Sequence, residues 1–216
     1  MSSTQKLAVV LGATGNQGGS VVKTLLAEGY RIRGITRNTK SDKALALQTK
    51  NIELVQGDLD DINSLHSAFA DAQFIFIVSD WGGVYYAAAS EAAATSAGSS
   101  GAQREPVRAV AGRREEQQLK NAIEAAAGVT TLERMVFSGL SKASKWSKGK
   151  FVNIHHFDSK ANAAEWGAEK FPELWKKTSI LQAGFFLPNF LGMDPLKPYK
   201  VRTPPHKRWV SKVVAR

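Results

Sequence analysis

The chain has 216 residues, of which 43% are hydrophobic and 22% are charged, as in an ordinary globular domain. It contains no cysteine, which excludes disulfides, thiolate metal sites and a cysteine nucleophile. No stretch approaches the roughly 18 apolar residues that span a bilayer, and the first residues lack the features of a secretory signal. We therefore expect an intracellular protein without membrane contact, in the cytosol or alternatively in the nucleus.

The formal net charge of +10 is concentrated near the end of the chain. Residues 1–196 hold 22 Lys and Arg against 19 Asp and Glu, whereas residues 197–216 hold seven cations and no acid. The body of the chain is therefore not basic enough to predict direct nucleic-acid binding. We interpret the basic end as a solvated segment, with a nuclear-import signal as the alternative.

The first elements predict a dinucleotide-binding unit. A buried strand over 6–11 leads into a Gly-x-x-Gly-x-x-Gly turn, a helix over 18–28 and a second strand over 31–36. This βαβ unit can hold a pyrophosphate, because glycines let the backbone approach the phosphates and the helix directs its unpaired N–H groups toward them. The candidate cofactor-binding residues of the turn are Gly12, Thr14, Gly15, Asn16, Gln17 and Gly18.

Strands and helices continue to alternate beyond this unit. We predict strands over 52–56, 74–78, 132–138 and 178–182, and helices that end near residues 69, 127 and 170. The alternation predicts an α/β fold of the Rossmann type, with a doubly wound parallel sheet.

Two segments depart from this pattern. Residues 87–102 are Ala, Ser, Gly or Thr except for Glu91, so we predict an inserted flexible loop over 84–113. Within it we expect transient helix over 87–97 and disorder over 96–102. The cofactor-binding domain is then expected over 1–192, followed by a basic irregular tail over 193–216.

The end of the second strand indicates which nucleotide is bound. NAD-binding proteins usually carry an acid there, whereas this chain has Arg37, with Lys40 close behind. A cation at this place would pair with a 2′-phosphate, so we predict NADP(H) as the cofactor. Asp58 follows the third strand and could approach the adenine; its alternative role is that of a turn residue.

Six motifs together resemble those of the NmrA-like proteins, an atypical family of the short-chain dehydrogenase/reductase superfamily. They are residues 12–18, 36–38, 56–58, 78–81, 156–160 and 183–190. The resemblance covers about residues 5–82 and 114–192. It implies a Rossmann fold and NADP(H) binding, with regulation in many members and reduction of quinones or aromatic compounds in others. It also implies a further region that completes the substrate pocket; we expect the resemblance to end near Met193, which leaves that pocket incomplete.

The catalytic residues of active reductases in this superfamily are only partly present. They use a Tyr-x-x-x-Lys pair, usually with a serine, but no tyrosine here has a lysine four residues later. His156 and Lys160 stand where that pair is expected, on one face of a helix that begins by His156. Lys160 can bind ribose hydroxyls, His156 is either a proton donor or a packing residue, and Ser138 ends the fifth strand at the expected edge. No metal-ligand cluster, carboxylate pair or Gly-x-Ser-x-Gly turn supports a hydrolase.

Three functions follow from these residues. The first is an NADP(H) sensor that docks a regulatory protein partner, because the glycine turn is intact and the catalytic tyrosine is missing. The second is an NADPH-dependent oxidoreductase acting on a quinone, an enone or an aromatic small molecule. The third is a truncated product with neither activity. We rank the sensor first on the sequence alone.

Overall fold

A computed structural model describes residues 5–48, 51–96, 105–184, 186–187, 189–192, 199–202 and 207–210. The chain divides into two compact units, 1–182 and 183–216. The first unit ends at the last strand of the main sheet, ten residues before the domain boundary at 192 that the sequence predicts.

The first unit contains the predicted doubly wound sheet. Six parallel strands lie in the order β3-β2-β1-β4-β5-β6, so the order reverses direction between β1 and β4. The strands are β1 (Leu7–Leu11), β2 (Arg31–Thr36), β3 (Ile52–Gln56), β4 (Phe74–Ile77), β5 (Arg134–Gly139) and β6 (Thr178–Gln182). The Rossmann-type fold is confirmed, because apolar runs such as β1 are buried on both faces of the sheet.

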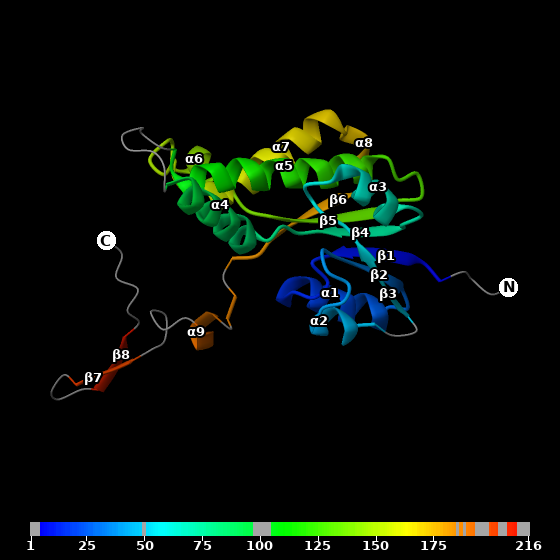
Figure 1. The fold of residues 1–216 in the computed structure, drawn as a ribbon, viewed down its shortest axis with the longest axis horizontal. Coiled ribbons are helices and arrows are strands. Elements are labelled where there is room, and N and C mark those ends of the chain that lie inside the picture. The colour runs from blue at the N-terminus through cyan, green and yellow to red at the C-terminus, as the bar shows by residue number, and fades with distance from the viewer. Residues whose placement is uncertain are drawn as a thin grey trace. The chain divides into compact units, whose positions relative to one another are not determined.

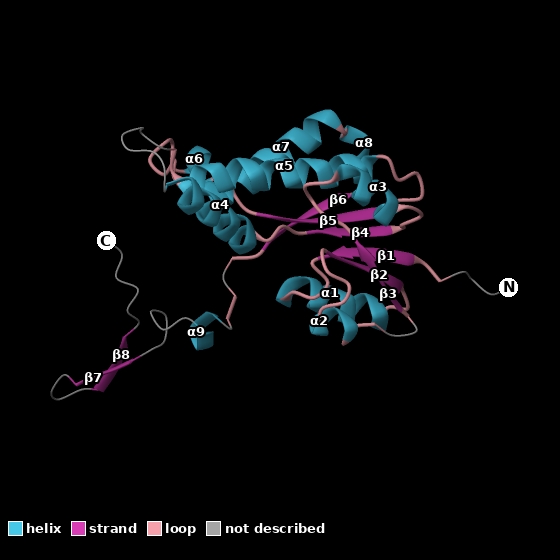
Figure 2. Cartoon of the chain, in the orientation of Figure 1, coloured by secondary structure: helices cyan, strands magenta, loops and turns pink. Residues whose placement is uncertain are grey.

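Helices cover both faces of this sheet (Figure 1). One face carries α1 (Asn16–Ala27) and α2 (Asp42–Leu45), and Figure 2 shows the remaining helices of this unit on the other face. These are α3 (Ile62–Phe69), α4 (Trp81–Ser96), α5 (Val107–Ala127), α6 (Ala143–Trp146), α7 (His155–Lys170) and α8 (Pro172–Trp175). Two buried clusters fill the space between the helices and the sheet, one on each face.

The flexible loop predicted over 84–113 is wrong for most of its length. Residues 84–96 belong to α4 and residues 107–113 begin α5, while the disorder expected at 97–102 falls outside the described residues. A third small cluster joins the two helices, with Val84, Ala88 and Ala111 buried at its centre. The helix forms because alanine has the highest helix propensity and the first turns of α4 carry an apolar stripe at helical spacing.

The second unit holds short elements only. It contains α9 (Asn189–Gly192) and an antiparallel pair, β7 (Tyr199–Arg202) and β8 (Lys207–Val210). The prediction of an irregular tail is wrong for these two strands, whereas residues 193–198, 203–206 and 211–216 lie outside the described part of the chain. Within the residues that the structure describes, no helix has the length and apolar character needed to cross a membrane.

Candidate functional site

The glycine turn lies between β1 and α1, beside the point where the strand order reverses. Gly12 has a φ of +62°, which favours glycine, and a Cβ at Gly18 would meet the Gly12 carbonyl oxygen at 2.2 Å. Gly18 therefore lets α1 pack directly on the turn. Gly15 is the N-cap of α1 and the first turn holds no acid, so the helix N–H groups are available to an anion. This arrangement fits a dinucleotide pyrophosphate.

A hydrogen bond links this turn to the end of β5. The buried Ser138 hydroxyl donates to Gln17 Oε1 at 2.9 Å. The structure thereby brings two predicted site residues together that are 121 positions apart in the sequence. Thr14 and Asn16 occupy the same turn, so all six predicted residues of the glycine motif lie at the carboxyl edge of the sheet.

Arg37 follows β2 at the same edge and is solvent-exposed. Its guanidinium lies 3.7 Å from the carboxylate of Asp80, which also accepts a hydrogen bond from the Gly83 N–H. Lys40 is exposed three residues further on. Sequence reasoning assigned no role to Asp80; its place three residues after the end of β4 is the signal that could have identified it.

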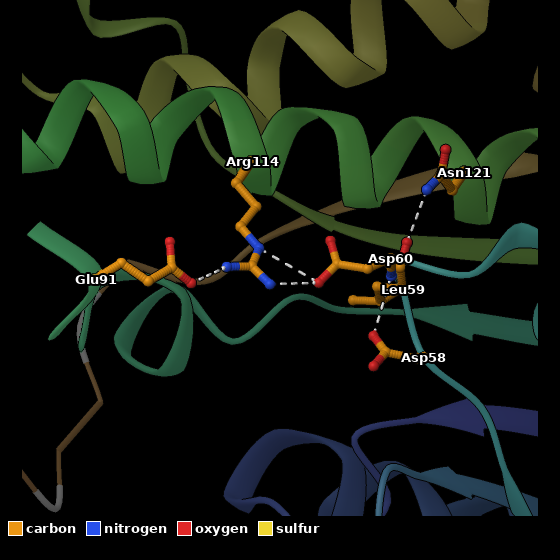
Figure 3. A network of polar contacts seen from close by, with 6 residues as sticks. All are labelled: Asp58, Leu59, Asp60, Glu91, Arg114 and Asn121. Atoms are coloured by element: carbon orange, nitrogen blue, oxygen red, sulfur yellow. Dashed lines mark hydrogen bonds and ion pairs between the residues drawn. The ribbon is translucent and has the colours of Figure 1, made fainter. Parts of the chain in front are cut away.

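Asp58 has a structural contact of its own. Its Oδ1 accepts a hydrogen bond of 3.0 Å from the Asp60 N–H, as in the turn role that the sequence left as the alternative. Figure 3 shows how this loop is tied to two helices: Arg114 of α5 binds the carboxylates of Asp60 and of Glu91 on α4. The Asn121 amide also donates to the Leu59 carbonyl oxygen. These contacts hold the loop after β3 and the α4–α5 pair in fixed positions.

Lys160 is buried and paired with a carboxylate that the sequence analysis missed. Its ammonium binds Glu115 of α5, whose side chain is fully buried. Glu115 also accepts hydrogen bonds from the hydroxyls of Ser159 and, at 2.7 Å, of Ser79. The signal was available, because Glu115 lies four residues before the buried Leu119 and so falls on the apolar face of its helix.

His156 lies one helical turn before Lys160, because α7 begins at His155 as the predicted pair requires. Its imidazole packs on Trp81, with ring centroids 5.4 Å apart, and on Phe157 at 4.8 Å. Burial lowers the pKa of His156, as do the cations Lys160 and Arg108 and the neighbouring His155, while the Glu115 carboxylate opposes the shift. The imidazole is therefore neutral at neutral pH, which makes it a poor general acid.

The described residues contain no group of three or more His, Asp or Glu side chains placed to hold a metal ion. The chemical groups that the described site brings together are one buried lysine–glutamate pair and several hydroxyls.

The chain is similar in sequence to known proteins. The model of the NmrA-like family matches residues 4–214, so the similarity extends past Met193, where the sequence analysis expected it to end. The chain is 32% identical over 196 residues to the NmrA-like family domain-containing oxidoreductase ptmS of Penicillium ochrochloron, covering 88% of this chain and 50% of that protein. It is 30% identical over 197 residues to the corresponding oxidoreductase lnaB of Aspergillus flavus, covering 90% and 51%.

Solved structures show the same fold. NmrA, described as a negative transcriptional regulator, has a TM-score of 0.62 at 20% identity, over 85% of this chain and 47% of that one. A structure of NmrA with NADP has a TM-score of 0.61 at 19% identity, over 85% and 46%. Triphenylmethane reductase of Citrobacter sp., complexed with NADP(H), has a TM-score of 0.54 at 20% identity, over 86% and 51%. The chain spans about half the length of the relatives that it matches.

Proposed function

The chain belongs to the NmrA-like family, and on this basis we propose that it is an NADP(H)-dependent oxidoreductase acting on a quinone, an enone or a small aromatic molecule. Relatives named as oxidoreductases match 88% and 90% of this chain, which supports an enzyme. This support reverses the order of preference that the sequence alone gave, in which a sensor came first.

The residues present fit the proposed cofactor. The N–H groups at the start of α1 would hold the pyrophosphate, Lys160 the hydroxyls of the nicotinamide ribose, and Arg37 the 2′-phosphate. NADPH, when bound, supplies a hydride. The described site contains no tyrosine beside Lys160 that could donate a proton. The role of the chain would then be to hold the cofactor and to orient it toward the acceptor.

The observation that carries the proposal is the buried Lys160–Glu115 pair. A buried charge pair is costly to desolvate and persists only when its geometry is well satisfied, as it is here by two serine hydroxyls. Such a fixed ammonium suits ribose binding. Since the imidazole of His156 is neutral, we assign the proton that accompanies the hydride to solvent, which suits acceptors such as quinones that need little acid catalysis.

Loss of NADPH absorbance with a panel of quinones and enones tests this function. We expect turnover that His156→Ala lowers less than about tenfold, since a general acid contributes about 10²–10⁴-fold. Lys160→Ala should raise the KM for NADPH. A folded protein that binds NADPH but oxidises none of it across the panel would overturn the oxidoreductase.

A regulatory NADP(H) sensor is the second candidate. It is favoured by the lowered pKa of His156 and by the missing tyrosine, which together leave neither member of the expected pair as an efficient general acid at neutral pH. NADPH binding without turnover, combined with a partner protein that binds only the cofactor-loaded form, would support it over the enzyme.

A further inference from the structure

A pocket of about 260 Å³ lies between α4, α5 and the start of α7. Trp81, Tyr85 and His156 form its aromatic wall, and Arg108, Asn153 and His155 supply polar groups. Because pockets for drug-sized ligands occupy about 300–1,000 Å³, this one suits a molecule of one or two rings. It shares His156 with the candidate site described above.

The aromatic wall is continuous and ordered by its own contacts. The rings of Trp81 and Tyr85 are stacked, with centroids 6.4 Å apart and planes 20° from parallel, and Trp81 also packs on His156. All three side chains are half-buried, so each still presents part of its ring to the pocket. Flat apolar walls of this kind favour a planar aromatic ligand by stacking.

The pocket carries a positive charge on Arg108 that no acidic side chain of its described lining residues balances. Arg108 is exposed, makes no ion pair with any residue that the structure describes, and is the cation of the pocket wall. The nearby carboxylates are occupied: Glu105 pairs with Arg113, and Glu115 pairs with Lys160. No acid is among the described residues that line the pocket. The same positive surroundings act on His156, whose pKa is lowered by burial and by Lys160 and Arg108.

We infer that this pocket binds a planar aromatic anion, with the rings against Trp81 and Tyr85 and the acidic group on Arg108. Guanidinium binds carboxylate and similar oxyanions through two parallel hydrogen bonds, and the Asn153 amide can supply a further donor. The inference rests on the proposed function, because the bound molecule would be the hydride acceptor; it narrows that acceptor to aromatic acids, phenolates and ionised hydroxyquinones.

Binding of two isosteric probes to the full chain tests the inference. We expect calorimetry without cofactor to show that 2-naphthoate binds about tenfold more tightly than the neutral 2-naphthamide, because a charge-assisted hydrogen bond is roughly twice as strong as a neutral one. Arg108→Gln should remove the preference for 2-naphthoate over 2-naphthamide, and Arg108→Lys should keep part of it. Equal affinity for the two probes, or no binding of either, would overturn the inference.

Arg134→Gln is the matched control. Arg134 is an exposed arginine at the start of β5, at the opposite edge of the sheet, so its loss removes the same charge away from the pocket. An equal loss of 2-naphthoate affinity in both variants would mean that net charge alone attracts the probe, and the inference fails. Circular dichroism and NADPH titration of each variant establish that the fold and the cofactor site are intact.

Different experimental results would contradict the anion pocket and the proposed oxidoreductase function. Turnover of NADPH with neutral quinones by a protein that does not bind 2-naphthoate would contradict only the anion pocket. Binding of 2-naphthoate in an Arg108-dependent manner by a protein that never oxidises NADPH would contradict only the oxidoreductase.

Discussion

At the scale of single residues, we propose that Arg37 determines which nucleotide is preferred. Its partner Asp80 is 68% exposed and Arg37 itself 71%, and such surface pairs contribute only about 0–1 kcal/mol. Arg37 can therefore leave Asp80 for a 2′-phosphate at little cost. We expect Arg37→Ala to weaken NADPH binding by about tenfold or more and to leave NADH binding unchanged.

Calorimetric titration at low salt with each nucleotide checks this prediction. Arg31→Ala is the control, because Arg31 is an exposed arginine at the other end of β2. A parallel loss of NADPH and NADH affinity in Arg37→Ala would assign the residue to the fold rather than to the 2′-phosphate.

Glu115 is the residue whose charge matters most to the buried part of the site. Removing one partner of a buried ion pair costs about 3–5 kcal/mol, whereas replacing both partners is often neutral. We expect Glu115→Gln and Lys160→Met each to destabilise the fold by that amount, and the double variant to regain most of the loss. Urea unfolding of the four proteins measures the coupling.

NADPH titration of the same four proteins separates stability from binding. The double variant should recover its stability and still bind NADPH poorly, because Lys160 is absent. Full recovery of NADPH affinity in the double variant would show that the pair supports the fold and has no part in cofactor binding.

At the scale of elements, the sheet was predictable from local sequence and the α4–α5 pair was not. The strands β1 and β4 follow from apolar runs, since central parallel strands buried on both faces leave a strong signal. The edge strand β6 was predicted from a short apolar stretch, although the structure leaves most of it exposed. Residues 84–96 have a weak local signal, because a helix rich in alanine has little apolar area to bury. The helix over these residues packs against α5 through a small buried cluster, and Arg114 of α5 also bridges Glu91 and Asp60 (Figure 3).

The candidate site likewise contains residues that could be predicted from the sequence and residues that could not. The glycine turn was predictable, because its roles are local: Gly12 needs a positive φ and Gly18 a close approach. Glu115 was missed because a charged residue on an apolar helix face has meaning only once its partner Lys160 is known to lie opposite. The aromatic pocket could not be predicted, since it depends on how α4, α5 and α7 meet.

At the scale of the whole molecule, His156 on α7 and Asp60 in the loop after β3 make the free energy of unfolding depend on pH in two separate ranges. The folded state lowers the pKa of His156, so the unfolded chain takes up a proton first and stability falls as the pH drops below about 6.5. Burial raises the pKa of Asp60, but hydrogen bonds from Arg114 and Gln118 and the charges of Arg114 and Arg37 outweigh it, and the net shift is downward. The stability that Asp60 contributes is thus present above about pH 4 and is lost below it.

Thermal unfolding between pH 8 and pH 3 distinguishes the two ranges, because each kcal/mol lost lowers the Tm of a chain of this size by about 2–4 °C. We expect His156→Gln to flatten the curve only in the range just below about pH 6.5, and Asp60→Asn to flatten it only below about pH 4. His66→Gln, at an exposed histidine of α3, is the matched control. A His156→Gln curve that stays parallel to the wild type from pH 7 to pH 5 would mean that the imidazole accepts a proton as readily in the folded protein as in the unfolded chain. In that case His156 could serve as a general acid near neutral pH, and the assignment of the proton to solvent would have to be abandoned.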